Sequence, residues 1–150
     1  MDKFMNEALL EAQKGIKKGG GPFGAVVVKS GKIVGRGYEC VLQNSDPTAH
    51  AEIVAIRNAS KNLKTHNLSG CVIYTTSEPC AMCMATIIEA KIKKCYFGCA
   101  LEDGFDLGYT DNNFYNLLEV KHDEMTECLD RQECLELFYT YSKKKDKRFF

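Results

Sequence analysis

Two short groups of residues offer side chains that bind metals and move protons. The first is His50 and Glu52, which are separated by one residue, and the second is Cys80 and Cys83, which follow Pro79. One imidazole and two thiols form a donor set that suits Zn²⁺. Three protein ligands are enough for a catalytic zinc ion, which leaves the Glu52 carboxyl group for acid and base work. These residues predict one metal site with a proton-transfer group beside it.

Helical geometry limits where such a site can lie. At about 100° per residue, Cys80 and Cys83 lie roughly 60° apart around a helix, so both sulfur atoms can reach one ion. His50 and Glu52 lie roughly 200° apart, so both reach that ion only at the N-terminal end of their helix. The fourth position is left for water, whose pKa the metal lowers and whose proton Glu52 can take. We expect one zinc ion per subunit.

Two other interpretations use the same residues. A fourth side chain would make the zinc site structural, and an isolated C-x-x-C pair is also typical of thioredoxin-like redox proteins. Both leave Glu52 without a role. The candidates for a fourth ligand are His66, Cys71, Cys95 and Cys99. The six cysteines outside the C-x-x-C pair are expected in the core as small apolar side chains: Cys40, Cys71, Cys95, Cys99, Cys128 and Cys134.

The spacing of apolar residues predicts the elements that position these groups. Helices are expected over Phe4–Lys17, Ala49–Leu63 (with Asp46 and Thr48 as possible caps), Pro79–Lys91, Phe114–Leu118 and Asp123–Lys145, the last interrupted near Asp130. Strands are expected over Phe23–Val28 and Lys32–Tyr38, joined as a hairpin, and over Cys71–Thr76 and Cys95–Gly98, with a loop from Asp103 to Asn113. This order predicts an α/β fold in which helices cover a mixed sheet.

Length and composition limit the class of protein. The 150 residues fit a single domain, and 45% of them are apolar, enough for a sizeable core. The formal net charge of zero weakens the case for a nucleic-acid or membrane-surface binder and favours a small-molecule substrate. No secretory signal and no membrane-spanning run is visible, so we expect a cytoplasmic protein whose cysteines serve a metal.

Three blocks of sequence resemble the cytidine and deoxycytidylate deaminase superfamily: Gly21–Val28, Asp46–Glu52 and Ser77–Cys83. The H-x-E and P-C-x-x-C groups together match the signature of its zinc deaminases. The chain is most similar to the branch of bacterial guanine deaminases, fungal cytosine deaminase and tRNA adenosine deaminases. The resemblance implies a five-stranded sheet between helices, a homodimer, and a base held by backbone groups near Ala51, Ser77 and Glu78. Glu52 would then pass its proton to a ring nitrogen and later to the departing amine, giving ammonia.

Guanine is the base that the resemblance favours. Phe23 stands where guanine deaminases carry an aromatic residue that packs on the purine. Asp111 resembles an acidic residue that those enzymes place over the leaving amine, although an Asx turn explains a loop aspartate equally well. Cytosine, another nucleobase or nucleoside, and tRNA adenosine are the alternative substrates.

Glu39 departs from the pattern of the family. It lies eleven positions before His50, where the relatives usually carry an Asn that contacts the base. A carboxylate only accepts hydrogen bonds, so a substrate edge that faces Glu39 should present N–H groups. The alternative is that Glu39 is a solvated strand end.

The C-terminal residues Lys143–Phe150 are basic and aromatic. A basic cluster can bind RNA, but a solvated tail is the preferred interpretation. The resemblance also implies that the terminal segment closes the pocket, which Phe149 and Phe150 could do.

Overall fold

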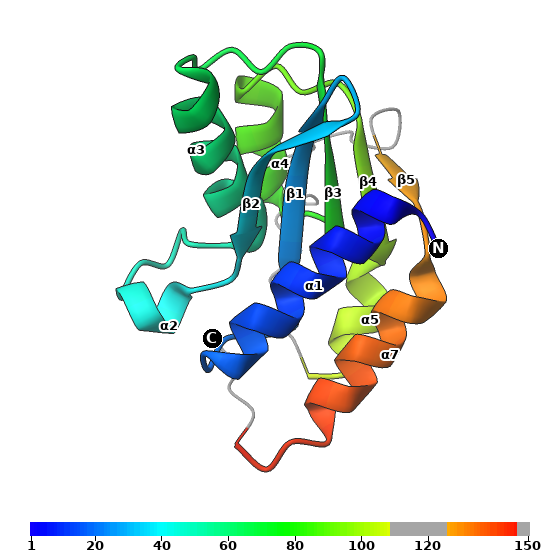
Figure 1. Cartoon of the computed structure of the whole chain (residues 1–150). Coiled ribbons are helices and arrows are strands. Elements are labelled where there is room, and N and C mark those ends of the chain that lie inside the picture. The colour runs from blue at the N-terminus through cyan, green and yellow to red at the C-terminus, as the bar shows by residue number, and fades with distance from the viewer. Residues whose placement is uncertain (109–125, 147–150) are drawn as a thin grey trace.

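The computed structural model describes residues 1–108 and 126–146 (Figure 1). The helices are α1 (Lys3–Lys17), α2 (Val41–Asn44), α3 (Ala51–Leu63), α4 (Ala81–Glu89), α5 (Leu101–Asp106) and α7 (Arg131–Ser142). The strands are β1 (Gly24–Lys29), β2 (Lys32–Tyr38), β3 (Cys71–Ser77), β4 (Cys95–Cys99) and β5 (Thr126–Cys128). Within the described residues, no helix is both long and apolar enough to cross a bilayer.

The five strands form one mixed sheet in the order β2-β1-β3-β4-β5. β1 is antiparallel to both β2 and β3, whereas β3, β4 and β5 run parallel. The predicted hairpin is confirmed, and it turns at Ser30 and Gly31, both with positive φ. Because β2, β3 and β4 share one direction, their C-terminal ends meet at one edge of the sheet, and β1 starts there. We use the term functional edge for this end of the sheet, where β2, β3 and β4 terminate; it is distinct from the outer strands.

Helices cover both faces of the sheet, which confirms the predicted layers (Figure 1). Successive side chains of β1 point to opposite faces, so Ala25 and Val27 pack with α3 and α4, while Val26 and Val28 pack with α1 and α7. A strand that is buried on both faces has a nearly continuous run of apolar residues, as β1 does. The sheet is therefore the centre of the core.

The outer strand β2 is covered at its free edge by side chains of α3. Asn58 Nδ2 donates to the carbonyl of Arg36 at 2.8 Å, and Asn62 Nδ2 donates to that of Val34 at 2.9 Å. The two asparagines lie four positions apart, one helical turn, and so match carbonyls two residues apart on a strand. These bonds fix the position of α3 along β2.

The last third of the chain differs from the sequence prediction. The helix expected over Asp123–Lys145 is wrong in its first part, because Thr126–Cys128 forms β5 and pairs with β4. The interruption near Asp130 is confirmed, since that residue has φ of 52° and precedes α7. Three residues are too few to show the alternating pattern of a strand, so pairing with β4, and not the local sequence, determines that this segment is extended. The short helix expected over 114–118 lies outside the described residues.

Two short helices were not predicted. α5 occupies the start of the expected 103–113 loop, because Asp103 accepts the Ala100 N–H at 2.9 Å and Glu78 accepts the Leu101 N–H at 3.1 Å. These carboxylates satisfy donors that the first helical turn leaves free. α2 is a single turn of four residues after β2.

Candidate active site

The starts of α3 and α4 lie at the functional edge. His50 is the residue before α3 and Cys80 the residue before α4, and both have extended backbones. The capping expected from Asp46 and Thr48 is wrong: Asp46 instead accepts the backbone and hydroxyl hydrogens of Thr48. The Cys40 N–H donates to the Ala49 carbonyl at 3.0 Å, which ties the end of β2 to the start of α3.

His50, Cys80 and Cys83 come together as the sequence predicts, with their ligand atoms within 4.8 Å of one another. His50 Nδ1 lies 3.7 Å from the sulfur of Cys80 and 3.6 Å from that of Cys83. Zn–S bonds of about 2.3 Å and Zn–N bonds of about 2.0 Å, at tetrahedral angles, separate the two ligand atoms by about 3.5 Å. The three side chains therefore fit one zinc ion.

The two thiols differ in their ionisation. A hydrogen bond from Cys83 lowers the pKa of Cys80 to about 4, against the opposing effect of burial. The hydrogen bond to Cys80, together with burial, raises the pKa of Cys83. The pair thus favours one thiolate beside one thiol, and a divalent cation would displace the remaining proton. Two helix N-termini aimed at the same point also favour negative sulfur.

Glu52 lies in the first turn of α3 and is 6% exposed. Burial, followed by the negative charge of Cys80, raises its pKa to about 7. A hydrogen bond joins its carboxyl group to Cys83. A group whose pKa lies near neutral pH can both accept and return a proton, which is what an acid–base catalyst requires.

The structural zinc site is not supported. No fourth His, Cys, Asp or Glu joins the three ligands within residues 1–108 and 126–146. His66 is exposed, and Cys95 is buried with its pKa raised by that burial. All eight cysteines are free, and Cys71, Cys95, Cys99 and Cys134 lie in the core as expected. The prediction is wrong for Cys128, which is exposed, and Cys40 is only half-buried.

Comparison with known proteins identifies the family. Residues 1–99 match the cytidine and deoxycytidylate deaminase zinc-binding region. The chain belongs to this deaminase family. It is 39% identical to guanine deaminase of Bacillus subtilis over 83% of its own length and 81% of the relative. It is 43% identical to a tRNA-specific adenosine deaminase of Aquifex aeolicus, over 63% and 62% of the two chains.

A solved structure supports the same assignment. The crystal structure of guanine deaminase from Bacillus subtilis has a TM-score of 0.74 and 35% identity, covering 99% of this chain and 98% of that one. The chain is accordingly a hydrolytic deaminase with a cytidine-deaminase-like fold, and its His and two Cys are positioned to bind a metal ion.

The residues expected to contact the base gather at the functional edge of the deaminase. The β1–β3 register ends with Ala25 opposite Thr75, and the Gly24 N–H and Pro22 carbonyl on either side of Phe23 bond to the Thr76 hydroxyl, so Phe23 lies beside the end of β3. The Phe23 ring is half-buried and meets the Phe138 ring of α7 edge-on at 5.2 Å.

The other residues expected near the base are Ala51, Ser77 and Glu78, of which Ala51 and Ser77 are buried. The Glu78 N–H donates to the Cys99 carbonyl, and the Glu78 carboxylate accepts the N–H of Leu101 at the start of α5.

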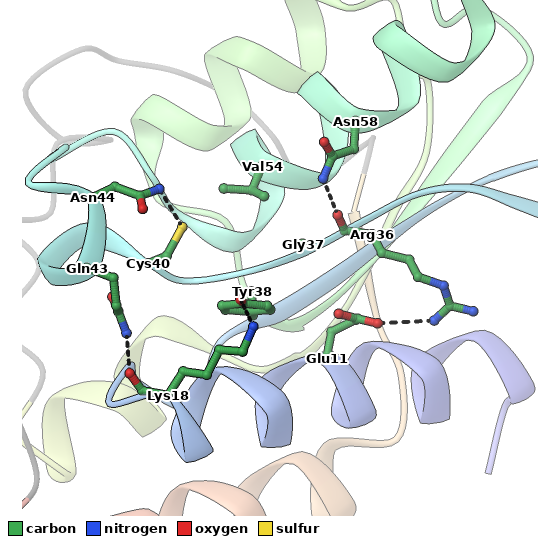
Figure 2. A pocket seen from close by; sticks show the side chains of 10 residues that line it. All are labelled: Glu11, Lys18, Arg36, Gly37, Tyr38, Cys40, Gln43, Asn44, Val54 and Asn58. Carbon is green, nitrogen blue, oxygen red and sulfur yellow. Dashed lines mark hydrogen bonds and ion pairs between the residues drawn. The ribbon is translucent and has the colours of Figure 1, made fainter.

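Glu39 is not a solvated strand end. It is 1% exposed, and each carboxylate oxygen accepts a backbone N–H: Oε2 from Gly21 at 2.8 Å and Oε1 from Val41 at 2.5 Å. A surface groove of about 290 Å³ lies nearby, between α1, β2, α2 and α3 (Figure 2). Neither Glu39 nor the three metal-binding side chains line it.

Sequence reasoning missed Thr76. This buried hydroxyl donates to the Pro22 carbonyl at 3.0 Å and accepts the Gly24 N–H at 3.1 Å. A threonine in a strand-like run carries no signal of such a role, because its partners lie more than fifty positions away. Asp111, Phe149 and Phe150, which the sequence also singled out, lie outside the described residues.

Proposed function

We propose that this deaminase hydrolyses a free purine base, with guanine as the substrate and xanthine and ammonia as the products. The observation that carries the proposal is the buried Glu52 carboxyl beside three metal-binding side chains. The match to guanine deaminase of Bacillus subtilis covers most of both chains, which supports the choice of guanine as the base. Phe23 at the functional edge supplies an aromatic surface suited to a purine.

His50, Cys80 and Cys83 would hold one zinc ion in this proposal. The bound ion would act as a Lewis acid and lower the pKa of water at its open position. The three side chains would hold the ion beside Glu52, because all four groups come from two helix starts at one end of the sheet.

Glu52 moves the protons. As a carboxylate it takes a proton from the attacking water, whose oxygen bonds to the ring carbon that bears the amine. It returns this proton to a ring nitrogen. In the second stage it carries the remaining hydroxyl proton to the amine, the C–N bond breaks, and ammonia leaves while a carbonyl forms. Guanine plus water thus balances xanthine plus ammonia.

The remaining site residues would orient the base. Phe23 would pack on the ring, and backbone groups near Ala51, Ser77 and Glu78 would bond its edge. We assign Asp111 to the leaving amine. This set follows the resemblance of the chain to guanine deaminases, and the position of Phe23 beside the end of β3 supports it.

Adenosine in tRNA is the second candidate substrate. The 43% identity to a tRNA-specific adenosine deaminase favours it, although that match covers 63% of this chain. The balanced net charge of the chain favours the free base instead.

A substrate panel tests the proposal. Zinc-loaded protein is assayed for ammonia release from guanine, cytosine, adenosine, guanosine and an adenosine-containing tRNA. We expect guanine to give the highest kcat/KM, and activity on tRNA alone would reject the free-base assignment. Glu52→Gln should lower kcat by about 10²- to 10⁴-fold while zinc content stays constant. The matched control is Glu89→Gln, the same change at an exposed position of α4.

We further propose that residues 1–150 form one domain that acts as a homodimer in a reducing cytoplasm. The eight free cysteines support the compartment. The 41% exposed Ile88 on α4 supports a subunit contact on that face. Light scattering on the purified protein would measure its mass directly.

A further inference from the structure

The four residues Gly21–Gly24 lead from α1 into β1 and carry Phe23. We call them the entry segment. The chain before it passes very close to the residue that follows β2: a Cβ atom on Gly20 would lie 2.6 Å from the Glu39 carbonyl oxygen. Only glycine fits there, so the entry segment begins against Glu39 rather than in open solvent.

Glu39 holds the entry segment at two points. Its carboxylate accepts the Gly21 N–H at 2.8 Å, and its own N–H donates to the Phe23 carbonyl at 3.1 Å. The other carboxylate oxygen accepts the Val41 N–H of α2. Figure 2 shows a further bond that ties α2 to the end of α1, from Gln43 Nε2 to the Lys18 carbonyl. Glu39 therefore joins the entry segment to a locally anchored α2.

Thr76 holds the same segment from the other side. Its hydroxyl donates to the Pro22 carbonyl and accepts the Gly24 N–H. Thr76 is fully buried in β3. One polar backbone atom of each of the four residues is thus bonded to Glu39 or to Thr76.

We infer that Glu39 and Thr76 clamp the entry segment and so set the position of the Phe23 ring, which makes Glu39 a positioning residue rather than a group that contacts the base. The inference rests on the proposed function, in which Phe23 packs on the purine. The clamp also explains why residue 39 carries a carboxylate instead of the amide usual in the relatives. Two N–H donors face the side chain, and an amide, with a single acceptor oxygen, would turn its own NH₂ group toward one of them.

The first test is Glu39→Gln, which keeps the shape of the side chain. Hydrogen exchange of the peptide containing residues 20–24 should become roughly 10- to 100-fold faster, the factor expected for a lost bond to a charged acceptor. The KM for guanine should rise about 10-fold with kcat changed less than twofold, because ring packing serves binding. Zinc content should not change.

A double-mutant cycle separates positioning from contact. If Glu39 acts through Phe23, Glu39→Gln should change KM less than twofold in a Phe23→Leu background. A full 10-fold effect in that background would show that Glu39 contacts the base directly and would overturn the inference. Glu11→Gln is the matched control. Glu11 is also a buried carboxylate, but it accepts from Lys14 and Arg36, so exchange at residues 20–24 and KM should stay unchanged.

Thr76 provides a second route if the Glu39 variant does not fold. Thr76→Val removes the hydroxyl at nearly constant volume and should speed exchange at residues 20–24, whereas Thr76→Ser should restore the parent rate. Equal exchange in both Thr76 variants would also overturn the clamp. If the parent protein releases no ammonia from guanine, the proposed substrate fails while the exchange measurements still decide the clamp.

Discussion

At the scale of single residues, the cysteine pair shows how position determines chemistry. Cys80 and Cys128 are both free and at least partly accessible, but their thiols differ. The hydrogen bond from Cys83 lowers the pKa of Cys80 to about 4, whereas partial desolvation raises the pKa of Cys128. Above pH 4 Cys80 is therefore a thiolate in the metal-free protein, while Cys128 ionises only at alkaline pH.

This difference predicts a pH-dependent ratio of alkylation rates in metal-free protein. At pH 6 Cys80 should react with iodoacetamide roughly 5- to 10-fold faster than Cys128, since its full ionisation outweighs the lower nucleophilicity of a weakly basic thiolate. The advantage of Cys80 should shrink at alkaline pH as Cys128 ionises. Peptide mapping by mass spectrometry gives both rates. Added zinc should protect Cys80 but not Cys128, and equal protection of Cys128 would contradict the assignment of ligands.

At the scale of elements, two glycines let α3 approach β2. A Cβ atom on Gly37 would lie 2.4 Å from the Ala51 carbonyl oxygen, and one on Gly35 would lie 2.3 Å from that of Ala55. Both positions therefore require the absence of a side chain. They differ in what they touch, because Ala51 follows His50, whereas Ala55 lies one turn further along the helix.

Gly37→Ala and Gly35→Ala consequently form a matched pair. Each should destabilise the fold by about 1–3 kcal/mol, the usual cost of overpacking. Only Gly37→Ala should also weaken zinc binding, since the displaced backbone leads directly to His50. Denaturant unfolding measures the first effect and competition with a chromogenic chelator the second. Equal zinc affinity in the two variants would mean that the start of α3 does not depend on this contact.

Sequence predicted these elements unevenly, for physical reasons. α1, α3 and α4 are long enough to show a helical period, and the metal-binding residues occur in a recognisable order at two helix starts. β5 and α5 are set by pairing with β4 and by the carboxylates of Glu78 and Asp103, neither of which leaves a periodic pattern. The roles of Glu39 and Thr76 depend on backbone partners distant in sequence. Local propensity cannot reveal such bonds.

At the scale of the whole molecule, the metal-binding side chains connect two separate crossovers. His50 precedes α3 and Cys80 precedes α4, and each helix follows a different strand. A ligand that binds only the folded chain adds to its stability according to its concentration and affinity. Zinc is therefore expected to hold the two helix starts together at the functional edge.

Chelation should accordingly lower the melting temperature. At free zinc about 1,000-fold above Kd the ion contributes about 4 kcal/mol, or roughly 8–16 °C for a chain of this size. Differential scanning calorimetry with and without a chelator measures the shift. His50→Ala should melt at the same temperature in both conditions, and a parent protein that did not respond to the chelator would contradict a tightly bound ion.

The asparagines of α3 also affect how copies of this chain behave in a crowded solution. An outer strand with free carbonyls is a template for strand addition, and thus for domain swapping and aggregation. On β2 the carbonyls of Val34 and Arg36 already accept from Asn62 and Asn58. An incoming strand would have to displace two side-chain amides supplied by the same molecule. The two side-chain amides thereby oppose strand addition along this border of the sheet.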